Sequence, residues 1–84
     1  MAYKLFTCVT LAEDLPEYGL PRGNLATIVE RHEADPVPRP GYSLEVFNAV
    51  GERIAVLVVE ESKVNLVKEN EILHVRRFDN VPAM

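Results

Sequence analysis

The sequence predicts an all-β domain, namely a small five-stranded SH3-like β barrel with a short helical turn before the last strand. Three observations predict it. Short runs of β-branched and aromatic residues alternate with polar ones, Gly, Pro and Asn separate these runs, and helical spacing never persists beyond a turn or two. Closing the sheet into a barrel also removes strand edges that would otherwise promote aggregation.

The first strand is expected from Lys4 to Leu11, where threonines are interspersed with apolar residues. Two prolines and two glycines between Ala12 and Asn24 exclude a continuous helix or a central strand, so this stretch predicts a long structured loop. We expect positive φ angles at Gly19 and Gly23. Three apolar residues would anchor the loop over one end of the barrel: Leu15, Tyr18 and Leu20. The second strand is expected from Leu25 to Glu30.

The second half begins with a charged, proline-rich connector from Arg31 to Gly41, in which Pro36, Pro38 and Pro40 favour an extended polyproline conformation. The third strand is expected from Tyr42 to Phe47. A hairpin turn containing Gly51 would join it to a fourth strand, Arg53 to Val59.

The end of the chain predicts a helical turn, a last strand and a frayed tail. Ser62 is a suitable N-cap, and apolar residues follow at helical spacing, which indicates a short helical turn over Ser62 to Val67. The alternation in Ile72 to Arg76 indicates the last strand, and Phe78 to Met84 would be frayed. Residues 1–84 therefore read as one domain.

Composition limits the environment and the partners. A chain of 84 residues with 48% apolar and 26% charged residues suits one folded core. A single cysteine, Cys8, forms no internal disulfide, and the sequence shows neither a signal-peptide pattern nor an apolar run that could cross a membrane. We therefore expect a cytoplasmic protein. The net charge of −4 repels a nucleic-acid backbone on average, which disfavours a nucleic-acid partner.

Three segments carry a resemblance to a known family. The run from Glu13 to Gly23, with Ala26 to Glu30 and then Tyr42 to Phe47 before a glycine hairpin, resembles the bacterial domain of unknown function 4926 over roughly Leu5 to Leu66. The resemblance implies a stand-alone SH3-like barrel. It also implies a paired, toxin-antitoxin-like arrangement with the product of a neighbouring gene. The proline-rich connector and the longer C-terminal strand depart from the family pattern.

Residues suited to catalysis or cofactor binding are sparse. His32 and His74 lack the spacing of metal ligands, and Cys8 lies in an apolar strand where a thiol is expected to be core packing. Adjacent carboxylates such as Glu60 and Glu61 diverge on an extended chain, and the four glycines form no phosphate-binding cluster. We therefore expect no enzymatic activity and no cofactor.

The fourth strand is the positive signal for function, because every residue from Ile54 to Val59 is apolar. A barrel strand buries one face, so the other needs a cover, which would be either Val64, Leu66 and Val67 of the helical turn or a partner. We interpret the chain as a protein-binding module that meets a protein partner or a second copy through this strand and the first loop. The candidate contact residues are Leu15, Tyr18, Leu20, Val56, Leu57 and Val59. The alternative is a structural accessory subunit of a redox or nucleic-acid complex.

Overall fold

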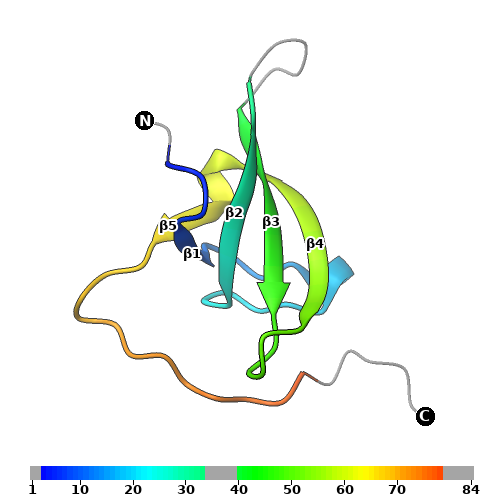
Figure 1. Cartoon of the computed structure of the whole chain (residues 1–84), viewed down its shortest axis with the longest axis vertical. Helices are drawn as coiled ribbons and strands as arrows, with labels where there is room; N and C mark the ends of the chain where they lie inside the picture. The colour runs from blue at the N-terminus through cyan, green and yellow to red at the C-terminus, as the bar shows by residue number, and fades with distance from the viewer. Residues whose placement is uncertain (1–2, 34–39, 79–84) are drawn as a thin grey trace.

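The fold is one antiparallel sheet of five strands, seen in a computed structural model that describes residues 3–33 and 40–78 (Figure 1). The strands are β1 (Cys8–Leu11), β2 (Leu25–His32), β3 (Gly41–Phe47), β4 (Arg53–Glu60) and β5 (Val64–Leu66). Two 3-10 turns accompany them, η1 (Pro16–Tyr18) and η2 (Glu61–Lys63). The strand order is β4-β3-β2-β1-β5, so β4 and β5 are the two edges of the sheet.

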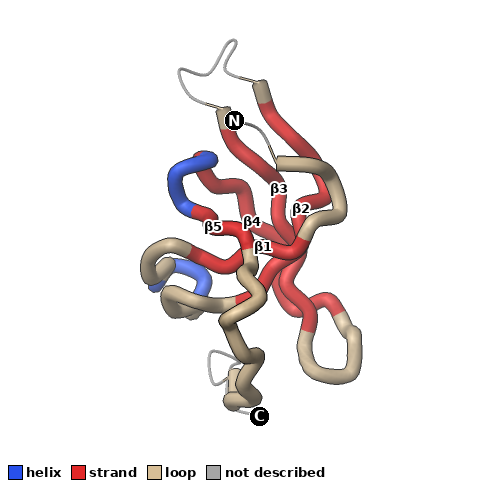
Figure 2. The backbone as a smooth tube through the Cα atoms, turned by 90° about the vertical axis from the view of Figure 1, so that its left-hand side faces the viewer, coloured by secondary structure: helices blue, strands red, loops and turns tan. Residues whose placement is uncertain are grey.

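The all-β class, the five strands and a helical turn directly before the last strand are confirmed. The SH3-like relationship itself stays a prediction. Figure 2 shows the strands bending around a common interior, and buried residues from all five strands and the first loop meet there in one core. The largest fully buried side chains are Tyr42, Leu11, Ile28, Leu44, Leu57, Val9 and Val46.

The first loop is structured, as predicted. Leu15 and Leu20 exchange backbone hydrogen bonds of 2.8 and 3.2 Å, which closes the loop around η1. Gly19 and Gly23 adopt φ angles of 70° and 90°, so the prediction of positive φ at both is confirmed. Both leucines are buried in the core, and this is what holds the loop against the sheet.

The first strand is shorter than predicted, because regular pairing begins at Cys8 and not at Lys4. Phe6 adopts a φ of 64°, a left-handed conformation that interrupts the extended backbone. Its N–H still donates to the carbonyl of Ile28 at 2.6 Å, so the chain follows β2 without forming a strand. Cys8 itself is exposed, and the expectation that it packs in the core was wrong.

The C-terminal part differs most from the prediction. The helical turn spans Glu61–Lys63 and not Ser62 to Val67, and the last strand is Val64–Leu66, paired with β1. Ile72 to Arg76 forms no strand. The prediction failed because apolar alternation indicates a strand only where a neighbouring strand can pair with it, and β1 pairs with the segment directly after η2.

The hairpin between β3 and β4 is confirmed. The N–H of Asn48 donates to the carbonyl of Glu52 at 2.8 Å, and the Asn48 side chain accepts from the N–H groups of Val50 and Glu52. Pro36, Pro38 and residues 79–84 of the expected frayed tail lie outside the described residues. Phe78 packs partly buried against the core. In the described part of the chain, no helix is long and apolar enough to span a bilayer.

Candidate functional site

The candidate site is the β4 outer face, which we define as Val56 and Val58. The sequence left open which alternate residues of β4 face outward. In the structure Leu57 and Val59 face the core, where they are buried opposite Leu44 and Tyr42 of β3. The alternate residues point away from the core, and 51% of Val56 and 62% of Val58 are exposed. Two neighbouring valines with this exposure form an apolar surface at the sheet edge.

The position of β4 strengthens this surface, because β4 is an end strand and pairs with β3 on one side. Figure 1 shows β4 along one margin of the sheet, opposite β1 and β5. An edge strand offers backbone N–H and C=O groups to another chain, and β-branched residues favour such pairing. The β4 outer face therefore combines apolar side chains with a strand edge.

The β3 residues opposite the β4 outer face are polar. Val56 lies opposite Glu45, which accepts a 3.0 Å hydrogen bond from Arg53, and Val58 lies opposite Ser43, which contacts His32 at 2.7 Å. These polar groups already have partners within the chain. A polar rim thus borders the β4 outer face on the β3 side, a layout common in protein interfaces.

The six candidate contact residues divide into two groups. The side chains of Leu15, Leu20, Leu57 and Val59 are buried in the core and stabilise the fold. Val56 is exposed on the β4 outer face, and Tyr18 of η1 is partly buried against the core with part of its surface in solvent. Sequence reasoning did not single out Val58 as a contact residue, although strict alternation with Val56 could have found it.

The cover expected within the chain is absent from the described residues. Val64 is buried beside β1, where it pairs with Leu11. Leu66 and Val67 are themselves partly exposed, and β5 is the strand farthest from β4 in the sheet order. Of the two covers considered for the outward side of β4, the one formed by these three residues is therefore excluded.

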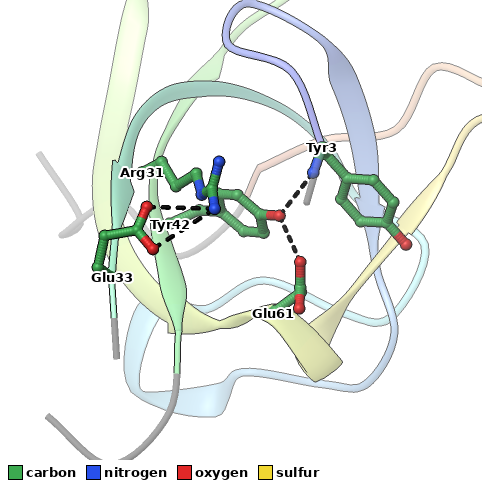
Figure 3. A network of polar contacts seen from close by, with 5 residues as sticks. All are labelled: Tyr3, Arg31, Glu33, Tyr42 and Glu61. Carbon is green, nitrogen blue, oxygen red and sulfur yellow. Dashed lines mark hydrogen bonds and ion pairs between the residues drawn. The ribbon is translucent and has the colours of Figure 1, made fainter. Parts of the chain in front are cut away.

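A partly buried polar cluster around Tyr42 joins β3 to the N-terminal segment and η2 (Figure 3). The Tyr42 hydroxyl donates to Glu61 at 2.7 Å and accepts from the N–H of Tyr3 at 2.8 Å, and the two tyrosine rings stack with centroids 5.9 Å apart. Burial raises the pKa of Tyr42, the N–H of Tyr3 lowers it, and Glu61 raises it again. This cluster organises the fold, and the scattered tyrosines of the sequence gave no signal for it.

The contact between His32 and Ser43 does not form a catalytic arrangement. Ser43 Oγ lies 2.7 Å and Glu30 Oε1 3.9 Å from the same atom, His32 Nε2. A base that activates a serine needs the acid on its other ring nitrogen. Among the described residues, no group of three or more His, Cys, Asp or Glu side chains is placed to hold a metal ion.

A second apolar feature lies after β5. Ile72, Leu73 and Val75 are 92, 69 and 82% exposed, although their pattern is that of a strand. Both views show the chain leaving the sheet after β5 and running on as a loop (Figures 1 and 2). An open cavity of about 690 Å³ separates this segment from the β3–β4 hairpin, and its lining includes Phe47, Val50 and Ile54.

The comparisons with known proteins place the sheet in a family. The family model for a domain of unknown function, DUF4926, matches residues 5–66. The chain belongs to the DUF4926 family. The match begins before β1 and ends with the last residue of β5, so the exposed segment after β5 lies outside the DUF4926 domain. Searches of curated proteins and of solved structures found no match.

Proposed function

We propose that this DUF4926 chain is a non-enzymatic module that binds a protein partner through the β4 outer face. The observation that carries the proposal is the pair of exposed valines, Val56 and Val58, on an edge strand. Such an edge left in water invites uncontrolled pairing, and natural sheets normally protect it with charge, proline or a covering element. A specific partner would provide that protection here.

The energetics set the size of the interface. Complete burial of a valine contributes about 1.5 to 3 kcal/mol, so covering the exposed halves of Val56 and Val58 contributes roughly 2 to 3 kcal/mol together. Association costs at least several kcal/mol in lost translational and rotational freedom. The two valines would therefore be the anchor of an interface that needs further contacts. Tyr18 of the first loop is the other candidate contact with surface available.

The surroundings of the site support a protein as the partner. The net charge of −4 disfavours a phosphate backbone, and a mixed apolar and polar surface is what protein interfaces use. We place the module in the cytoplasm of a bacterium, paired with the product of a neighbouring gene in a toxin-antitoxin-like arrangement. The alternative is an accessory subunit of a redox or nucleic-acid complex.

The test compares partner recovery by matched variants. The full chain and its Val58→Glu variant are used as baits in lysate of the native host, with recovered proteins quantified by mass spectrometry. Leu5→Glu is the control, because Leu5 is 47% exposed but lies outside β4. We expect one partner in stoichiometric amount with the parent and with Leu5→Glu, and at least a tenfold loss with Val58→Glu.

The outcomes separate the readings. Equal recovery by all three baits would remove the β4 outer face as the binding site. Recovery of many subunits of one redox or nucleic-acid assembly, lost together in Val58→Glu, would favour the accessory-subunit alternative. Recovery of the chain itself as the dominant partner would identify a homomeric interface.

A further inference from the structure

The segment from Ile72 to Arg76, which we call the C-terminal segment, has the residue pattern of a strand without a sheet to join. Ile72 and His74 alternate with Leu73 and Val75, and three of these four residues are apolar and more than two-thirds exposed. The segment lies beyond the DUF4926 match. Apolar side chains in this number are costly in water unless another surface covers them.

The sheet has the complementary deficiency. β4 lacks a neighbour on one side, and its outer face exposes Val56 and Val58. A strand added at that edge would place one parity of its side chains beside these valines and would pair the backbone groups of β4. The chain therefore carries both an edge without a strand and a strand-like segment without an edge.

Charge favours the same pairing. Residues 1–66 carry ten acidic and six basic side chains, whereas the C-terminal segment carries Arg76 and no acid, and Arg77 follows it directly. A basic segment approaching an acidic domain is attracted to it, and complementary potentials guide the encounter of interfaces. In the structure the Arg76 side chain already donates to an acceptor of the sheet domain, the side-chain oxygen of Asn24.

We propose that the C-terminal segment of one copy adds as a sixth strand to the β4 edge of a second copy, reciprocally, which forms a symmetric dimer. The inference rests on the proposed function and names its partner as a second copy of the chain. Two identical seams form in such a dimer, so both β4 edges and both C-terminal segments are covered at once. A different protein at β4 would leave the C-terminal segment exposed.

The connecting residues allow the exchange. Residues 67–71 lie between β5 and the C-terminal segment and span at most about 17 Å when extended. They contain a turn in which the N–H of Glu71 donates to the carbonyl of Lys68 at 3.0 Å. In the single chain the C-terminal segment lies across a cavity from the β3–β4 hairpin and not along β4. Exchange of a terminal element on a short connector is a common route to dimers.

The first experiment is sedimentation of the purified full chain over a concentration series. We expect a monomer–dimer equilibrium whose Kd rises at least about tenfold in Val58→Glu and in Leu73→Glu, and is unchanged in the control Leu5→Glu. Leu73 lies outside the sheet and is 69% exposed, so its substitution leaves folding intact even if Val58→Glu destabilises the strand. Circular dichroism melts verify this.

The second experiment locates the contact between copies. Isotope-labelled chain is mixed with unlabelled Cys8→Ser, Ile72→Cys chain that carries a spin label at the new cysteine. Line broadening of the β4 amide signals in the labelled copy supports the exchange. Broadening confined to the signals of other strands contradicts it. The exchange is also contradicted if the β4 signals broaden only in a sample in which the spin label and the isotopes are on the same chain.

The outcomes distinguish this inference from the proposed function. A parent that stays monomeric at millimolar concentration overturns the dimer, while a different protein lost from Val58→Glu baits still supports binding at β4. A dimer that Val58→Glu weakens and Leu73→Glu does not overturns the role of the C-terminal segment and keeps β4 as an interface. A dimer whose Kd changes in neither variant excludes both the C-terminal segment and the β4 outer face from the contact between copies.

Discussion

Single residues show where local chemistry suffices for prediction and where it does not. Gly19 and Gly23 were predicted at positive φ because the turn residues beside them require it, and both adopt it. Cys8 was predicted in the core and is exposed. Its strand has apolar residues on both parities, so the phase of burial depends on strands far away in the sequence. The same ambiguity left the parity of β4 open.

Gly41 is the glycine for which the structure leaves the least room. A Cβ built there would lie 2.5 Å from the carbonyl oxygen of Val59 on the neighbouring strand. We expect Gly41→Ala to lower the free energy of unfolding by about 1 to 3 kcal/mol, because backbone must move to admit the methyl group. Urea denaturation measures it.

The matched control for Gly41 is Gly51→Ala. A Cβ added at Gly51 would have open space around it, and the φ angle there is 86°. The Gly51→Ala substitution should therefore lower the free energy of unfolding by about 1 kcal/mol, through backbone strain alone. A Gly41→Ala variant no less stable than Gly51→Ala would contradict the close approach of β3 and β4 at this position.

Tyr42 predicts a pH dependence of stability. Burial raises the pKa of Tyr42 in the folded state above the unfolded value near 10. A raised pKa means that the stabilisation is complete below about pH 10 and is lost as the pH rises from there through the folded pKa. We expect the melting temperature to fall above pH 10, and to fall less steeply in Tyr42→Phe.

The same variant has a cost at neutral pH. Tyr42→Phe removes the hydrogen bonds to Glu61 and Tyr3, and we expect it to lower the free energy of unfolding by about 1 to 2 kcal/mol. Glu61→Gln retains an acceptor for the hydroxyl and should cost less. Equal stability of parent and Tyr42→Phe at pH 7 would show that the cluster does not stabilise the fold.

At the scale of elements, the strands that pair with sequence neighbours were predictable and the last one was not. β3 follows from its alternation, β4 from the hairpin that joins it to β3, and β2 from the turn before it. β5 has three residues, and its place depends on β1, more than fifty positions earlier. Three residues are too few to show a clear alternation, whereas the C-terminal segment alternates over five residues. The C-terminal segment was therefore predicted as the last strand in place of β5.

Two alanine substitutions test which segment is the last strand. Val64 of β5 is 3% exposed, whereas Val75 of the C-terminal segment is 82% exposed. We expect Val64→Ala to lower the free energy of unfolding by about 2 kcal/mol in dilute solution, and Val75→Ala by less than about 0.5 kcal/mol. Chemical denaturation of both variants at low micromolar concentration measures this. The reverse order would restore Ile72 to Arg76 as the last strand.

At the scale of the whole molecule, the buried side chains of residues 3–33 and 40–78 meet in one core. The candidate site was predictable to the level of a strand, because six consecutive apolar residues cannot all face inward. Which of them face outward, and that η2 and β5 leave them uncovered, depends on the strand order. The identity of the partner depends on the partner's own surface, so a pattern in this sequence could not name it.

The charge of the whole chain gives the last prediction, which addresses the nucleic-acid form of the accessory-subunit alternative. Thirteen acidic against nine basic side chains give a net charge of −4, and non-specific binding to a duplex arises from basic side chains that displace counterions. Arg76 and Arg77 are the densest basic pair in the described C-terminal part, and the acidic domain lies beside them.

We expect no change in the fluorescence anisotropy of a labelled 20-base-pair duplex at about 150 mM salt and protein up to about 100 μM, a range in which non-specific binders bind. An Arg76→Glu, Arg77→Glu variant should give the same flat curve. Saturable binding by the parent that weakens steeply with salt and disappears in this variant would show that the arginine pair overrides the net charge, and would move the chain into the nucleic-acid class.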